Sequence, residues 1–92
     1  MTLLREDKTS KPDFTYIGFM YPAVDRVMRR FMLGAEKYSR GNWRECTDPQ
    51  TYKESALRHY LQYINGQADE DHLAAACANL LILLDLENKN DV

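Results

Sequence analysis

The residues from 69 to 79 place carboxylates, an imidazole and an amide close together. Asp69, Glu70 and Asp71 directly precede His72, and Asn79 follows seven residues later, on the same face of a helix. Carboxylates beside an imidazole are what a divalent cation or a general base requires. A structural interpretation is also open. The acids then complement the dipole of a helix N-terminus, and Asn79 makes a polar contact that sets the register of an oligomer.

A second candidate site lies at Arg58 and His59. His59 follows Ala56 by three residues and flanks the apolar face of a predicted helix, where a histidine is either a hydrogen-bonded core residue or a ligand and proton carrier. Arg58 is suited to a phosphate group or to the carboxylate of Glu54, one turn earlier.

The third candidate is the segment 34–44, in which aromatic and cationic side chains alternate. Tyr38 and Trp43 stand beside Lys37, Arg40 and Arg44. Cations bind phosphates and aromatic rings stack on bases, so this segment has the composition of a nucleotide site. The alternative is that the tryptophan closes one end of a helical core.

Three helices are expected to position these residues. Apolar residues at helical spacing predict a first helix from Pro22 to about Tyr38. Asp48-Pro49 is typical of a helix start and Asn65-Gly66 of a helix end, which together bound a second helix. A third helix is expected after Asp69, with the acids in its first turn, and continues to about Leu86. The stretch from Thr15 to Tyr21 is expected to be a packed loop or a brief strand.

The third helix is apolar on nearly every side, which predicts burial on every side, with Cys77 as a small core residue. Three short helices do not easily enclose one of their number. The fold class is therefore predicted as all-α, a small bundle of about three helices that oligomerises, as a dimer or higher, through a buried C-terminal helix. Residues 1–14 are predicted to be a flexible arm, and residues 15–90 a single α-helical domain.

The composition excludes several classes of protein. With 92 residues, 45% hydrophobic and 28% charged, the chain is one globular domain, and two cysteines make neither a disulfide framework nor a zinc motif. The net charge of −2 argues against non-specific nucleic-acid binding, and no sequence-specific nucleic-acid partner is expected. The charge is uneven, because residues 25–68 carry eight bases against five acids (+3) and residues 69–92 one base against six acids (−5). No membrane span or signal peptide is recognised, so a cytoplasmic location is expected.

Two segments, GAEKYSRGNW (34–43) and ALRHYLQYINGQADEDHLAAACAN (56–79), resemble in this order a phage and bacterial family of dATP/dGTP diphosphohydrolases, near the all-α MazG-like pyrophosphohydrolases. The resemblance implies a nucleotide-binding domain that hydrolyses purine (deoxy)nucleoside triphosphates with Mg²⁺ to a monophosphate and pyrophosphate. It implies Glu36, Glu54, His59 and His72 as catalytic residues and Glu36, Asp69 and Asp71 as metal ligands. Residues implied to bind the nucleotide are Lys37, Tyr38, Arg40, Asn42, Trp43, Arg44, Arg58 and Asn79.

The sequence departs from the family pattern at several of these positions. Gln67 stands where glutamate follows the glycine, and Ala75 stands where a second histidine is frequent. Each change removes a metal ligand or a base.

An alternative function is therefore a non-catalytic phage protein of the host cytoplasm that sequesters a nucleotide immune signal, such as a cyclic dinucleotide or an ADP-ribose derivative. A third hypothesis for the function is a structural or protein-binding helical bundle. If the pocket binds a nucleotide, Trp43→Ala and Arg58→Ala are expected to weaken binding with little loss of helicity.

Overall fold

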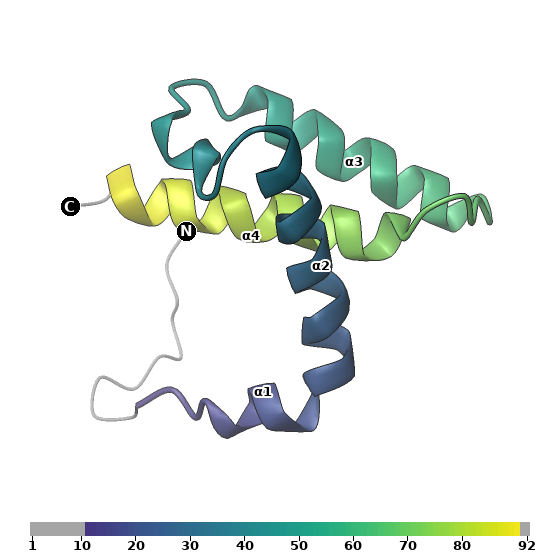
Figure 1. The fold of residues 1–92 in the computed structure, drawn as a ribbon, viewed down its shortest axis with the longest axis horizontal. Coiled ribbons are helices and arrows are strands. Elements are labelled where there is room, and N and C mark those ends of the chain that lie inside the picture. Colours follow the sequence, from purple (N-terminus) through teal and green to yellow (C-terminus); the bar gives the residue numbers. More distant parts are fainter. Residues whose placement is uncertain (1–10, 91–92) are drawn as a thin grey trace, which may run out of the picture.

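The computed structural model describes residues 11–90, which contain four α-helices and one short 3₁₀-helix (Figure 1). These elements are α1 (Thr15–Phe19), α2 (Tyr21–Lys37), η1 (Asn42–Glu45), α3 (Gln50–Ile64) and α4 (His72–Asn90). There is no strand in this range, so the predicted all-α class is confirmed. Residues 1–10 of the predicted flexible arm (1–14) lie outside the described part of the chain.

The core forms where α3 and α4 lie side by side, running in opposite directions, with α2 crossing α4 (Figure 1). Its buried side chains are mostly alanines, namely Ala56 on α3 and Ala74, Ala75, Ala76 and Ala78 on α4, joined by Ile82 and Leu86. Small side chains at a helix contact let the two backbones approach closely. The core is therefore thin, and it leaves Leu80, Leu81 and Leu84 of α4 exposed.

The expectation of a loop or strand at Thr15 to Tyr21 is wrong, because this stretch forms α1 and the first residue of α2. Asp13 caps the turn, since its Oδ1 accepts hydrogen bonds from the backbone N–H of Thr15 at 3.0 Å and from the Thr15 hydroxyl. These bonds also lower the pKa of Asp13 below its usual value. A helix satisfies its backbone internally, whereas a lone strand has no partner.

The predicted helix ends agree with the structure to within a few residues. Asp48 Oδ1 accepts the N–H of Gln50 at 3.1 Å at the start of α3. Gly66 takes a φ of 77° after α3, the left-handed conformation expected there. The acids before His72 do not lie in the first turn of α4 as expected. They precede it, and Asp71 Oδ1 accepts the N–H of Ala74 at 3.2 Å.

The last helix is not buried on every side within the single chain, in keeping with the expectation that three helices do not enclose it, and its burial in an oligomer stays a prediction. Leu80 is 53% and Leu84 63% exposed, and Cys77 is exposed rather than a core residue. The reason is geometric, because α2 and α3 cover only part of the surface of α4. No described helix combines the length and the apolar character needed to cross a membrane.

Candidate functional site

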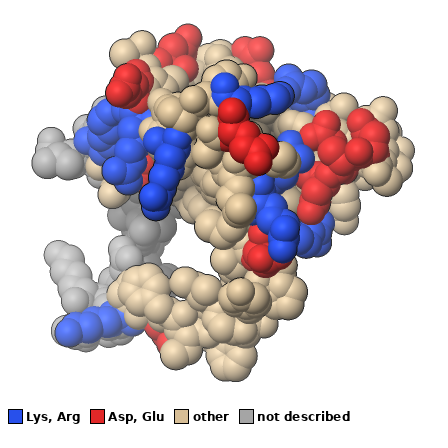
Figure 2. All heavy atoms as spheres, in the orientation of Figure 1, with Lys and Arg blue, Asp and Glu red and all other residues tan. Residues whose placement is uncertain are grey.

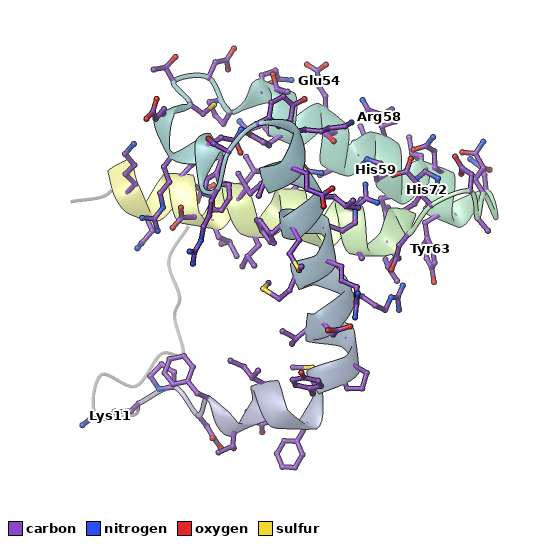
Figure 3. All side chains as sticks on the ribbon, in the orientation of Figure 1. Lys11, Glu54, Arg58, His59, Tyr63 and His72 are labelled. Atoms are coloured by element: carbon purple, nitrogen blue, oxygen red, sulfur yellow. The ribbon has the colours of Figure 1, made fainter. Side chains whose placement is uncertain are left out.

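Two histidines meet where the start of α4 packs against the later half of α3 (Figure 3). The Nδ1 atoms of His59 and His72 are 2.9 Å apart, and His72 Nε2 lies 2.7 Å from Oδ1 of Asp69. His72 is only 2% exposed, whereas His59 is half-buried. The Asp69 carboxylate accepts a hydrogen bond from Nε2–H of His72, and the other ring nitrogen of His72, Nδ1, faces His59.

Glu70 brings a second carboxylate to the two imidazoles. One oxygen of Glu70 and one ring nitrogen of each histidine all lie within 4.8 Å of one another. Glu70 Oε1 is itself held at 2.8 Å by Nη2 of Arg30 on α2. We call His59, Asp69, Glu70 and His72 the histidine cluster. Two imidazoles and a carboxylate form a donor set typical of transition-metal sites, and a carboxylate on the outer nitrogen of a ligating histidine is the usual support.

Burial of the imidazole lowers the pKa of His59 below its usual 6.5, and the cations Arg30 and Arg58 act in the same direction. The hydrogen bond to His72 lowers the pKa of Asp69. At neutral pH the cluster therefore holds a neutral His59 beside an ionised carboxylate. This is the protonation state in which imidazole nitrogens bind a metal ion or accept a proton.

Asp71, a predicted metal ligand, is engaged elsewhere. Its two oxygens accept hydrogen bonds from Nε and Nη2 of Arg26, both at 2.8 Å. The bidentate arginine lowers the pKa of Asp71 to about 2. Arg26 and Arg30, one turn apart on α2, thus tie the segment before α4 to α2 through Asp71 and Glu70.

This ion pair predicts a pH-dependent loss of stability in Asp71→Asn. A lowered pKa in the folded state stabilises the protein above the unfolded value of about 4, and this contribution disappears as the pH falls toward 2. We expect the variant to melt a few degrees below the parent at pH 7 and at nearly the same temperature near pH 2. Thermal unfolding followed by circular dichroism measures both values. A gap that is unchanged from pH 7 to pH 2 would contradict the assigned pair.

Trp43 and Arg44 lie against the opposite end of α4. Trp43 Nε1 donates to Oδ2 of Asp85 at 2.9 Å, and its ring packs on Phe31 with centroids 5.2 Å apart. Arg44 Nε is 3.5 Å from the same Asp85 oxygen, and Lys89 Nζ donates to the carbonyl of Arg44. These contacts fix η1 to α2 and α4. They give Trp43 a packing role, and its predicted contact with a nucleotide stays a prediction.

Glu54 and Arg58 lie one turn apart on α3, and Arg58 directly precedes His59 (Figure 3). They line a shallow hollow of about 410 Å³ together with Gln62, whose buried Oε1 has no hydrogen-bond partner among the described residues. Arg58 Nη2 also donates to Ser55 Oγ at 3.4 Å. An unpaired buried acceptor beside a cation suits a polar ligand.

Asn79 is satisfied within the chain. Its Nδ2 donates to Ser55 Oγ at 3.1 Å and to the carbonyl of Ala75 at 2.9 Å, joining α3 to α4. The other predicted site residues are exposed at the end of α2 and in the segment that follows: Glu36, Lys37, Tyr38, Arg40 and Asn42. The structure therefore brings together His59, His72 and Asp69, and it places the predicted residues of segment 34–44 apart from them.

Two residues of this site, Arg26 and Arg30, were absent from the residues predicted by sequence. Glu70 was named with the acids before His72 but was not among the implied metal ligands. Arg26 and Arg30 lie off the apolar stripe of α2 and four residues apart, a spacing that puts two cations on one helix face. This four-residue spacing is the sequence signal from which the two arginines could have been identified. Their pairs with Asp71 and Glu70 are 45 and 40 positions apart in the chain and have no local sequence signature.

A family model described as "dATP/dGTP diphosphohydrolase, N-terminal" matches residues 3–92 of the chain. No curated protein and no solved structure matches it. The matched range includes α2, α3 and α4, and with them every residue of the histidine cluster and both of the arginines that hold it.

Proposed function

The chain belongs to the dATP/dGTP diphosphohydrolase N-terminal family, and from this premise we propose that it hydrolyses purine deoxynucleoside triphosphates at a metal site in the histidine cluster. The reaction consumes one water molecule and gives a nucleoside monophosphate and pyrophosphate. The observation that carries the proposal is the buried His72, held through Nε2 by Asp69 while its Nδ1 faces His59, with a carboxylate oxygen of Glu70 near both rings.

The donor set of the cluster fits a divalent metal ion. His59, His72 and Glu70 would be the ligands, and Asp69 would fix the tautomer and orientation of His72. Imidazole nitrogens suit Mn²⁺, Co²⁺ and Zn²⁺ better than Mg²⁺, which prefers oxygen ligands. We therefore expect a transition metal to bind more tightly than the Mg²⁺ that the family resemblance predicts.

When bound, a divalent ion there would offset the charge of the phosphates and lower the pKa of a coordinated water. The chain itself supplies cations for the same phosphates. Arg58 is exposed directly before His59 on α3, and Arg30 lies beside Glu70. Guanidinium groups bind phosphate oxygens in a bidentate manner, so Arg58 orients the triphosphate while Arg30 keeps Glu70 in place.

Activity and metal binding are expected to depend on pH through His59. Because its pKa lies below 6.5, the neutral ring that ligates a metal persists to mildly acidic pH. We expect near-constant metal affinity from pH 8 to about 6.5, followed by a loss at lower pH as the ring takes up a proton. Titration with Co²⁺, followed by its visible absorption at several pH values, measures this profile. A midpoint clearly above 6.5 would rule out a buried neutral His59 as a ligand.

The function is tested by incubating the purified chain with a panel of nucleotides and with Mg²⁺, Mn²⁺, Co²⁺ or no metal. Chromatography before and after heat denaturation then separates the outcomes. Monophosphate plus pyrophosphate in equal amounts, formed only with metal, supports the proposal. Intact nucleotide that disappears and returns on heating instead supports the alternative, sequestration of a nucleotide signal. If nucleotides are neither bound nor changed, the structural bundle is left as the interpretation of this chain.

A further inference from the structure

The helix α1 forms an apolar arm that extends away from α3 and α4 (Figure 1). None of the residues of α1 is buried, and Phe19 is 77% exposed. The chain carries no charged residue from Thr15, at the start of the arm, to Val24 in the first turn of α2. Figure 2 shows this part of the molecule as mostly uncharged surface, whereas charges of both signs cover the rest of the same view. Such an arm is an interaction surface rather than a solvated terminus.

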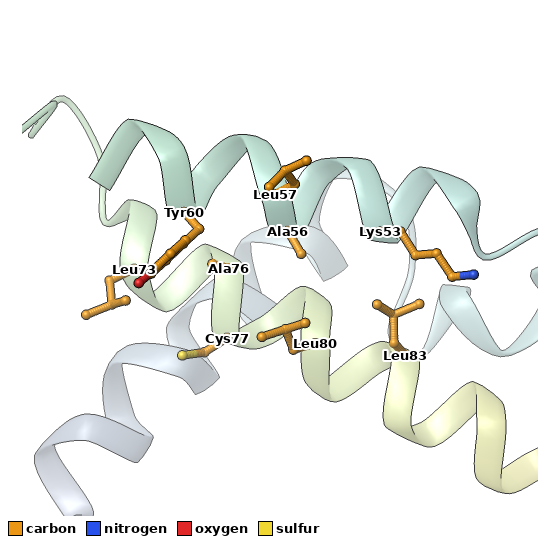
Figure 4. A pocket seen from close by; sticks show the side chains of 9 residues that line it. All are labelled: Lys53, Ala56, Leu57, Tyr60, Leu73, Ala76, Cys77, Leu80 and Leu83. Atoms are coloured by element: carbon orange, nitrogen blue, oxygen red, sulfur yellow. The ribbon is translucent and has the colours of Figure 1, made fainter. Parts of the chain in front are cut away.

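A complementary hollow surface lies on α4. One groove of about 430 Å³ runs between α3 and α4, lined by Leu57, Tyr60, Leu73 and Leu83 (Figure 4). A second groove of about 340 Å³ lies between α4 and the start of α2. Both grooves share Cys77 and Leu80, so they form one apolar surface that is continuous across α4. Its lining contains a single charged residue, Lys53.

Large apolar side chains are exposed on both the arm and the α4 surface. Phe19 is 77% exposed on the arm, and Leu80 and Leu84 are 53% and 63% exposed on α4. Contiguous exposed apolar surface of this kind marks an interaction site.

We propose that two copies of this chain form a dimer in which the α1 arm of each copy packs into the apolar surface on α4 of the other. A second copy is the occupant because this chain carries both halves of the contact, a protruding aromatic arm and an apolar hollow with a single charged residue in its lining. A twofold axis relates two such contacts, so the arm and the hollow of both copies are covered at once. A different protein that offered only an arm or only a hollow would leave the other surface of this chain exposed. The dimer completes the burial of α4 that the sequence predicts and the single chain lacks.

The dimer is tested by light scattering of the purified chain after size-exclusion chromatography, with three variants. Leu80→Lys places a charge in the hollow surface and Phe19→Lys places one on the arm. Both side chains are exposed, so the fold of the single chain is expected to persist, which circular dichroism verifies. We expect a dimeric parent and a monomer for both variants. Thr47→Lys adds the same charge at an exposed position outside both surfaces and is expected to remain a dimer.

Cross-linking distinguishes exchanged arms from another arrangement. One chain carries Ile17→Cys and Cys77→Ser, the other keeps the native Cys77 and has Ile17 unchanged, and both carry Cys46→Ser. After mixing, a short bismaleimide is expected to link position 17 of one chain to Cys77 of the other. A monomeric parent overturns the proposal, as does a dimer that both lysine variants leave intact. If Phe19→Lys remains a dimer and no cross-link forms between position 17 and Cys77, the exchange of arms is overturned.

Discussion

Replacing His72 with alanine is expected to weaken binding of Mn²⁺ or Co²⁺ by more than about 100-fold and to remove metal-dependent hydrolysis. The substitution takes away a buried ligand and also separates Asp69 and His59 from the partner that each contacts at 2.7 Å and 2.9 Å. The affinity is measured by calorimetric titration of the metal, and the activity by release of pyrophosphate.

The design separates loss of the site from loss of the fold. His59→Gln removes the half-buried ligand without emptying the core and is expected to show a similar loss of metal binding. Asp69→Asn keeps every ligand and changes only the support of His72, so a smaller loss of about 10–100-fold is expected. Glu87→Gln, an exposed carboxylate later on α4, is the matched control and is expected to behave as the parent. Parent-like metal affinity in a folded His72→Ala would refute the assignment of the site.

Replacing Trp43 with alanine is expected to lower the free energy of unfolding by about 2–4 kcal/mol. The indole is half-buried, packs on Phe31 and donates to Asp85, so its removal detaches η1 from both α2 and α4. Asp85 also loses the partner that holds it near Arg44. Equilibrium unfolding in urea, followed by circular dichroism, measures the change.

Trp43→Phe separates the two contributions of this residue. It keeps an aromatic ring against Phe31 but loses the hydrogen bond to Asp85, for which about 1 kcal/mol is expected. The same variants test the predicted contact of Trp43 with a nucleotide. If the residue contacts a ligand and is not needed for packing, nucleotide affinity falls while the unfolding free energy of Trp43→Ala stays at the value of the parent. That result would contradict the packing role.

The helices were predictable because their signals are local. Asp48-Pro49 before α3 and Gly66 after it specify a start and an end through the neighbouring backbone alone, and the structure follows both. The stretch at Thr15 was mispredicted because its aromatic composition favours a strand or a loop. The hydrogen bond from Thr15 N–H to Asp13, which supports the helix start, was the local signal that was missed. The burial of α4 on every side stays a prediction for the oligomer, because composition shows how apolar a helix is and not which neighbouring surfaces cover it.

The sequence by itself determined the all-α class, the ends of α3 and the family, because caps, helical periodicity and the order of short motifs are properties of the chain. It also indicated His59, His72 and Asp69 as residues with chemistry. Only the tertiary structure decided that the two imidazoles meet, that Glu70 rather than Asp71 joins them, and that Arg26 and Arg30 hold both acids. The physical reason is distance along the chain. Contacts between residues thirteen to forty-five positions apart depend on how helices pack, and no local pattern encodes them.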